Sequence, residues 1–243
     1  MIPQWMSTVA SVGMAIGPPL VYADQAISII KRKDSKGFSQ DVCAILLIAN
    51  IMRCFFWLGD RFELALLIQS LCMILAQLGL LFICVKYRPK ASPESLGGPS
   101  SRPFGFWQWT YYAPYLEFLA ALILVLTIAV LIFGRMEWFV WGLGFVALGL
   151  ESTLPLPQLY SNYNNKTLYG FETITLMGWV GGDAYKTVYF FILHSPLQFK
   201  VCGAFQLATD LVIVGQRIVY GNAEPLYTQV DNDLEEALRL AEE

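Results

Sequence analysis

Long apolar segments separated by short polar stretches divide the chain, and each is about long enough to cross a membrane as a helix. About 20 apolar residues span the roughly 30 Å of hydrocarbon in a bilayer. Backbone groups in lipid must be satisfied within the segment, and these runs lack the alternation of a barrel strand, so helices are predicted. The seven predicted spans are Trp5–Ile30, Val42–Leu58, Leu64–Val85, Pro114–Phe133, Met136–Tyr160, Phe171–Leu193 and Val201–Tyr220.

The polar stretch between the third and fourth spans, Lys86–Tyr112, differs from the other connections in its length and its content of proline, glycine and serine. This composition is typical of a flexible linker. It ends in the aromatic cluster Phe106–Tyr112, which is typical of a membrane interface.

Charged residues are scarce and unevenly placed. Of 243 residues, 56% are apolar and only 14% are charged, against about a quarter in soluble domains, which indicates lipid as the solvent. Lys and Arg concentrate in the loops after spans one, three and five, so those loops and the tail are expected in the cytosol and the N-terminus in the lumen. The basic residues on this face are Lys31, Arg32, Lys33, Lys36, Lys86, Arg88, Lys90, Arg102 and Lys166; those opposite are Arg61, Arg135 and Lys200.

No pattern of residues indicates an enzyme or a bound cofactor. The five cysteines lie in apolar runs without metal-ligand spacing, and we interpret them as packing residues. No phosphate-binding loop, zinc or haem spacing, nucleophile elbow or nucleic-acid surface is evident. The first apolar run lacks the basic start and cleavage site of a signal peptide, so a permanent first helix is expected.

The chain repeats itself at an offset of 133 residues. Gln25 matches Gln158, Asn50 matches Asp183 and Arg53 matches Lys186, and after a four-residue insertion Gln69 meets Gln206. Each copy covers three spans, and the fourth span returns the second copy to the orientation of the first. We therefore predict an all-α membrane protein with two parallel three-helix bundles joined by a linker helix (3+1+3). The expected divisions are 1–88, 89–112, 113–135, 136–220 and 221–243.

A Pro-Gln pair, Pro157–Gln158, ends the first span of the second copy, and Asp24–Gln25 stands at the matching place in the first. With the Pro-Gln pair of its second copy, from which the first copy departs at Asp24, the chain resembles the PQ-loop family, whose fold is related to that of the SWEET sugar carriers. Within the family it is similar to the subgroup of solute carrier family 66, member two, and its fungal relatives. The segments that carry this similarity include Gly37–Ser39, Ala49–Ile51, Arg61–Glu63, Phe106–Trp109, Gly182–Thr187 and Pro196–Phe199.

The resemblance implies a transport function of one of two kinds. The wider family includes proton-coupled exporters of amino acids from lysosomes, and fungal members of the subgroup are associated with phospholipid scrambling in Golgi and endosomal membranes. Energy-independent scrambling is our leading hypothesis, with membrane phospholipids as substrate. The alternatives are a proton-coupled exporter of a small solute and a non-transporting membrane scaffold or sorting partner.

Ionisable side chains inside spans cost about 3 kcal/mol each on insertion scales, and those present usually face the bundle interior or water. Asp183 and Lys186 are three residues apart and can pair on one helix face. Either a buried ion pair that only fixes packing or a wet substrate pathway accounts for such residues. The candidates for the pathway are Asn50, Arg53, Asp183, Lys186, Glu151 and Asp210.

The span that carries Glu151 is predicted to kink, because Pro155 and Pro157 remove backbone donors there. Glu151 is expected either to carry a proton or to bond a neighbouring helix. The candidate hinge elements are the motif residues Asp24, Gln25, Pro157 and Gln158.

The tail carries Tyr227–Val230, a tyrosine-x-x-apolar pattern that coat adaptors read as a sorting address, before an acidic helix expected over Asp233–Glu243. With Tyr227 and Val230 as its key residues, the pattern is consistent with Golgi, endosomal or lysosomal residence. The basic loop Lys31–Lys36 either sets topology or also contacts anionic lipid heads.

Overall fold

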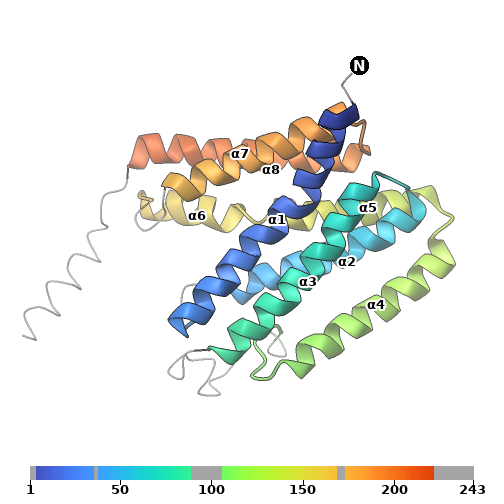
Figure 1. Cartoon of the computed structure of the whole chain (residues 1–243), viewed down its shortest axis with the longest axis horizontal. Coiled ribbons are helices and arrows are strands. Elements are labelled where there is room, and N and C mark those ends of the chain that lie inside the picture. The colour runs from blue at the N-terminus through green and yellow to red at the C-terminus, as the bar shows by residue number, and fades with distance from the viewer. Residues whose placement is uncertain (1–3, 36–37, 89–105, 169–172, 222–243) are drawn as a thin grey trace, which may run out of the picture. The chain divides into compact units, whose positions relative to one another are not determined.

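The computed structural model describes residues 4–35, 38–88, 106–168 and 173–221, and these residues form helices and connections with no strand among them. The helices are α1 (Gln4–Arg32), α2 (Gln40–Gly59), α3 (Leu64–Lys86), α4 (Ala113–Phe133), α5 (Glu137–Ser152), α6 (Leu156–Asn165), α7 (Thr173–Ile192) and α8 (Leu197–Tyr220) (Figure 1).

Each predicted span corresponds to observed helix, with boundaries that agree within a few residues. The fifth span is interrupted: α5 ends at Ser152 and α6 begins at Leu156, directly after Pro155, as the predicted kink required. Among the described residues, five segments have the length and hydropathy of membrane spans, namely α2, α3, α4, α5 with α6, and α8. The structure is therefore all-helical and consistent with a membrane fold, whereas the 3+1+3 arrangement stays a prediction.

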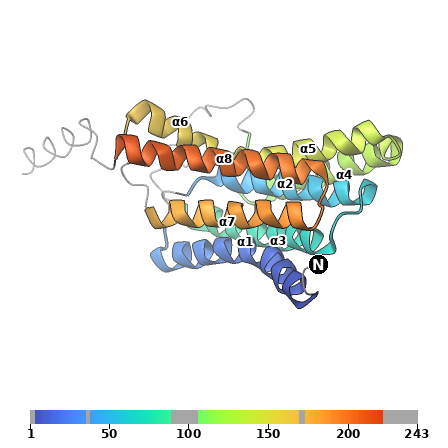
Figure 2. The ribbon, with the colours of Figure 1, turned by 90° about the horizontal axis from the view of Figure 1, so that it is seen from above.

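The helices group into two compact units. Unit 1 holds residues 1–151 together with 195–198, and unit 2 holds residues 152–194 and 199–243. In unit 1, α3 packs against both α1 and α2, and α2 also contacts α4; Figures 1 and 2 both show α1 alongside α3. Leucine is the most frequent of the apolar residues that fill the interior of this unit, and its side chains pack densely in low-energy rotamers; the fully or almost fully buried ones are Leu46, Leu47, Leu66, Leu80 and Leu81.

Helix α5 packs closely against α2 at two glycines. A Cβ added at Gly59 would lie 2.5 Å from a methyl group of Val140, and one added at Gly144 would lie 2.8 Å from the ring of Phe56. Phe56 is fully buried, so its ring has no room to move aside. Small residues of this kind allow membrane helices to approach closely where van der Waals contact drives association.

The aromatic end of the linker packs onto unit 1 instead of extending away from it. Trp107 is only 1% exposed, and its indole nitrogen donates a hydrogen bond of 2.9 Å to the backbone carbonyl of Gln40. The hydroxyl of Tyr115 donates to the carbonyl of Trp109, and Arg88 donates to the side-chain oxygen of Gln40. These bonds join the linker to the ends of α2, α3 and α4.

Unit 2 contains α6, α7 and α8 around a small core of Leu168, Leu176 and Ile213. Near the other end of α8, a Cβ added at Gly203 would lie 3.1 Å from the ring of Phe190. The left-handed residue Lys166 ends α6.

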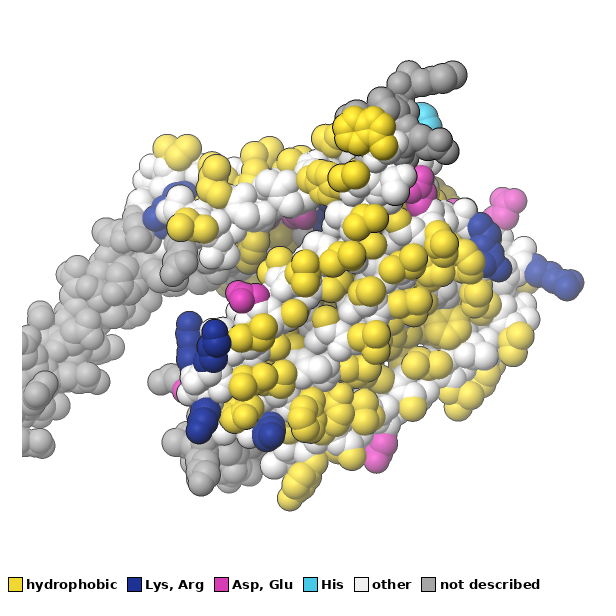
Figure 3. Space-filling model, in the orientation of Figure 1, with side chains coloured by type: hydrophobic (Ala, Val, Ile, Leu, Met, Phe, Trp, Pro, Cys, Tyr) yellow, Lys and Arg dark blue, Asp and Glu magenta, His cyan; other side chains and the backbone are white. Residues whose placement is uncertain are grey.

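Much of the helical surface is apolar and exposed, as expected where hydrocarbon replaces water. In the most apolar stretch of α4, only 11% of the residues are buried. Figure 3 shows hydrophobic side chains across the visible face of α1, α3 and α4, whereas Lys and Arg gather near the helix ends. This distribution matches a lipid-facing surface with charged rims.

Candidate functional site

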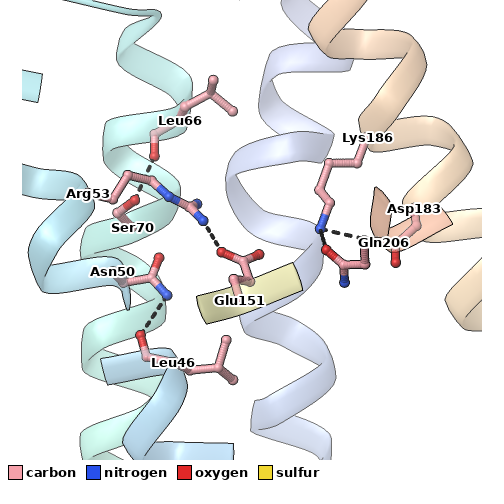
Figure 4. Close-up of polar contacts among 9 residues, drawn as sticks. All are labelled: Leu46, Asn50, Arg53, Leu66, Ser70, Glu151, Asp183, Lys186 and Gln206. Atoms are coloured by element: carbon pink, nitrogen blue, oxygen red, sulfur yellow. Dashed lines mark hydrogen bonds and ion pairs between the residues drawn. The ribbon is translucent and has the colours of Figure 1, made fainter. Parts of the chain in front are cut away.

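Two sets of polar side chains lie inside the helical units, and each is described separately. In unit 1, Arg53 on α2 forms an ion pair with Glu151 at the end of α5 (Figure 4). The two side chains are 3% and 14% exposed, so the ion pair is largely buried inside the protein. An arginine and a carboxylate in such a place stabilise each other's charge and tie the two helices together.

Buried amides extend this polar set along α2 and α3. The side-chain nitrogen of Asn50 donates to the Leu46 carbonyl at 2.8 Å, but no described group donates to its oxygen. Gln69 and Gln77 are 2% and 0% exposed. The oxygen of Gln69 and both polar atoms of Gln77 lack hydrogen-bond partners among the described residues. Buried amides require partners, so ordered water or a polar ligand is expected inside this bundle.

In unit 2, Asp183 and Lys186 form the pair that their spacing predicts. The Lys186 ammonium lies 3.1 Å from Oδ1 of Asp183 and donates to Oε1 of Gln206 on α8, also at 3.1 Å (Figure 4). The three side chains thus link α7 to α8. The Gln206 contact was not predicted from the sequence, although the repeat aligned Gln206 with the buried Gln69.

Asp210, one helical turn after Gln206, is fully buried. Its charged neighbours are Asp183 and Lys186. With both carboxyls ionised, no described side chain donates a hydrogen bond to either oxygen of Asp210. Two neighbouring carboxyls can share a hydrogen bond only when one of them holds a proton. The interior of unit 2 therefore brings together two carboxyls and one ammonium.

The predicted hinge residues occupy different environments. Asp24 and Gln25 are exposed on α1, which continues through this point to Arg32, whereas Pro157 and Gln158 lie in the first turn of α6. The Gln158 amide donates to Asn162 at 2.7 Å, Asn162 donates to Gln216 of α8 at 3.0 Å, and Gln216 donates to the Leu159 carbonyl at 3.1 Å.

Sequence reasoning missed Asn162 and Gln216 in this network, because a short polar helix was interpreted as the end of a span. The i, i+4 spacing of Gln158 and Asn162 was the signal that could have identified the first bond. Whether any of these residues acts as a hinge stays a prediction. The sorting pattern of Tyr227 and Val230 and the expected helix Asp233–Glu243 lie outside the described residues.

The arrangement offers groups that bind charge and exchange protons. Within the described part of the chain, no three His, Cys, Asp or Glu side chains lie together as a metal site. The two polar sets present an arginine, a lysine, carboxylates and amides on helices α2, α3, α5, α7 and α8.

Comparison with known proteins identifies the family. The model of the PQ loop repeat matches the chain twice, over residues 6–66 and 139–199. The chain is also 30% identical to Scramblase ANY1 of Saccharomyces cerevisiae, in an alignment that covers 90% of this chain and 72% of the yeast protein. The chain belongs to the PQ-loop repeat family.

The polar residues described above are divided between the two PQ-loop copies. Arg53 lies in the first copy, whereas Glu151, Asp183 and Lys186 lie in the second. The ion pair between Arg53 and Glu151 therefore joins the two PQ-loop copies. Although α5 belongs in sequence to the second copy, its residues up to Glu151 group structurally with unit 1.

Proposed function

We propose that this PQ-loop protein is an energy-independent phospholipid scramblase. The observation that carries the proposal is its 30% identity, over most of both chains, to a protein named as a scramblase. A membrane protein of this kind equilibrates lipids between leaflets and needs no energy source.

The chemistry inside the spans fits the demands of such a substrate. A phospholipid head carries a phosphate, and many heads also carry an ammonium group. Arg53 and Lys186 provide positive charge, Asp183 and Glu151 provide negative charge, and Asn50 provides a buried oxygen with no described partner. Such groups lower the cost of moving a charged head through hydrocarbon.

Removal of one charge from the unit 2 cluster tests this role. The Asp183→Asn variant keeps the size of the side chain but leaves the Lys186 ammonium without its carboxylate partner. We expect slower scrambling, because the balance of charge along the path changes. The measurement follows fluorescent phosphatidylcholine in liposomes that contain purified protein, with dithionite bleaching of the outer leaflet and without any ion gradient.

Glu117→Gln provides a matched control, because it neutralises an exposed carboxylate on α4. This variant should scramble at the rate of the unaltered protein. Equal rates in the two variants, with both well folded by size-exclusion chromatography, would remove Asp183 from the path. Failure of the unaltered protein to scramble any lipid would overturn the proposed function.

A second candidate function, proton-coupled export of a small solute, is favoured by one observation. Asp210 is fully buried beside Asp183 and Lys186, and two neighbouring carboxyls of this kind suit the uptake and release of a proton. The same liposomes distinguish the two functions. Solute uptake that depends on a pH gradient, without lipid movement, would support the exporter.

We also propose residence in Golgi and endosomal membranes, with coat adaptors recognising the tail at Tyr227. Fluorescence microscopy of the tagged full-length chain provides the measurement. The Tyr227→Ala variant should shift from internal membranes towards the cell surface, because the aromatic ring is the invariant element of the tyrosine-x-x-apolar pattern. An unchanged distribution would exclude this address.

A further inference from the structure

An apolar groove of about 330 Å³ lies between α2, α4 and α5 in unit 1. Its volume is near the lower end of the roughly 300–1,000 Å³ typical of small-molecule sites. Apolar side chains and one glycine line it, among them Met52 of α2, Leu126 and Ala129 of α4, and Phe139, Gly142 and Val146 of α5. The groove is separate from the residues proposed for the transport path, although Met52 directly precedes Arg53.

The groove results from the spacing of its residues. Phe139, Gly142 and Val146 recur at intervals of three and four and form one face of α5. The glycine leaves this face open, because a Cβ added at Gly142 would meet no atom within 4 Å. By contrast, a Cβ at Gly144 would meet the Phe56 ring. The open space at Gly142 is therefore not required for the contact between α2 and α5.

The extent of the groove along the helix axes is close to the hydrocarbon thickness of one leaflet. Leu126 lies seven residues before the end of α4, and Val146 lies nine residues after the start of α5. At 1.5 Å per residue, the groove extends about 10–14 Å from the α4–α5 connection. Half of the roughly 30 Å hydrocarbon core is about 15 Å. A chain that enters beside the connection would therefore reach almost to the middle of the bilayer.

The connection itself provides a positive charge at the mouth of the groove. Arg135 is exposed and lies in the short segment between Phe133 and Glu137. An exposed arginine next to the end of a membrane-spanning helix complements a lipid phosphate. The apolar lining and the neighbouring cation together match one amphipathic molecule, with its tail in the groove and its phosphate outside.

We propose that this groove binds one acyl chain of a phospholipid from the leaflet next to the α4–α5 connection, with Arg135 contacting the phosphate. The groove is an accessory lipid site that holds α4 against α2 and α5 through a bound tail. This inference does not depend on scrambling, since a lipid bound here need not cross the membrane.

The test uses purified full-length protein in phosphatidylcholine vesicles that contain a trace of phosphatidylcholine with a diazirine in its acyl chain. After illumination, mass spectrometry should find label enriched in the peptides of Ala129 and Gly142, relative to the exposed lipid-facing residues of α3. Gly142→Leu fills the groove and should lower this labelling several-fold. Gly79→Leu is the matched control, because Gly79 is an exposed helical glycine of unit 1 whose added Cβ also meets nothing within 4 Å.

Two further variants complete the test. Ala129→Leu fills the groove from α4 if Gly142→Leu fails to fold, and Arg135→Gln should lower labelling by weakening the phosphate contact. Uniform labelling of all exposed helices, or unchanged labelling in the groove-filling variants, overturns the site. Unchanged labelling in Arg135→Gln overturns the phosphate contact, and labelling by a diazirine sterol but not by the phospholipid overturns the assigned ligand. Scrambling measured on the same vesicles distinguishes a failure of the lipid site from a failure of the proposed scramblase function.

Discussion

At the scale of single residues, Arg53 and Glu151 stabilise the fold as a pair, because each buried charge is neutralised by the other. Both partners are largely buried, so removing one takes the opposite charge of the ion pair away from the other inside a span. Arg53→Met or Glu151→Leu alone should each lower the free energy of unfolding by about 3–5 kcal/mol. The double variant removes both charges and should lose much less than the sum.

Denaturant-induced unfolding of the purified protein in detergent measures this coupling. The informative quantity is the difference between the loss in the double variant and the summed losses in the single variants. Losses that simply add would show that the two side chains do not act as a pair. The sequence predicted that Glu151 either carries a proton or bonds a neighbouring helix. It did not name Arg53 as the partner, because the two residues are separated by 98 positions and no local pattern relates them.

At the scale of secondary-structure elements, hydropathy located the helices well because the bilayer fixes the length of an apolar segment. The prediction Leu64–Val85 is one residue shorter than α3, which ends at Lys86. Proline chemistry likewise predicted the interruption between α5 and α6. What hydropathy could not show is how α6 is held, because hydrogen bonds between helices depend on tertiary contacts that one sequence does not display.

Asn162 links α6 to α8, because its Nδ2 donates to Gln216 of α8 while its Oδ1 accepts a hydrogen bond from Gln158, one turn earlier on α6. The side chain is 1% exposed. Asn162→Ala would leave both glutamines without these bonds, and we expect the free energy of unfolding to fall by about 1–3 kcal/mol. Asn164→Ala is the control, because Asn164 is exposed on the same helix. Equal losses in the two variants would show that the network does not stabilise the contact of α6 with α8.

At the scale of the whole molecule, the number of spans decides which loops share a face. Among the described residues, the segments with the length and composition of membrane spans are α2, α3, α4, α5 with α6, and α8, and α1 and α7 are not among them. Asp183 and Lys186 lower the hydropathy of α7, and their pairing with each other and with Gln206 reduces the cost of placing them in a membrane. The same residues that suggest function therefore weaken the compositional signal for a span.

Cysteine labelling determines this topology. We expect that α1 and α7 cross the bilayer, so that Trp5, Arg135 and His194 lie on one face and Lys166 on the other. Each is exposed, and single cysteines at these positions, in a variant without the native cysteines, can be tested with a membrane-impermeant maleimide in sealed vesicles. If α7 did not cross, His194→Cys would react on the face of Lys166→Cys; if α1 did not cross, Trp5→Cys would do so. If Trp5→Cys, Arg135→Cys and His194→Cys all react on one face, both α1 and α7 must span the membrane. If either helix did not span, Trp5→Cys or His194→Cys would react on the opposite face.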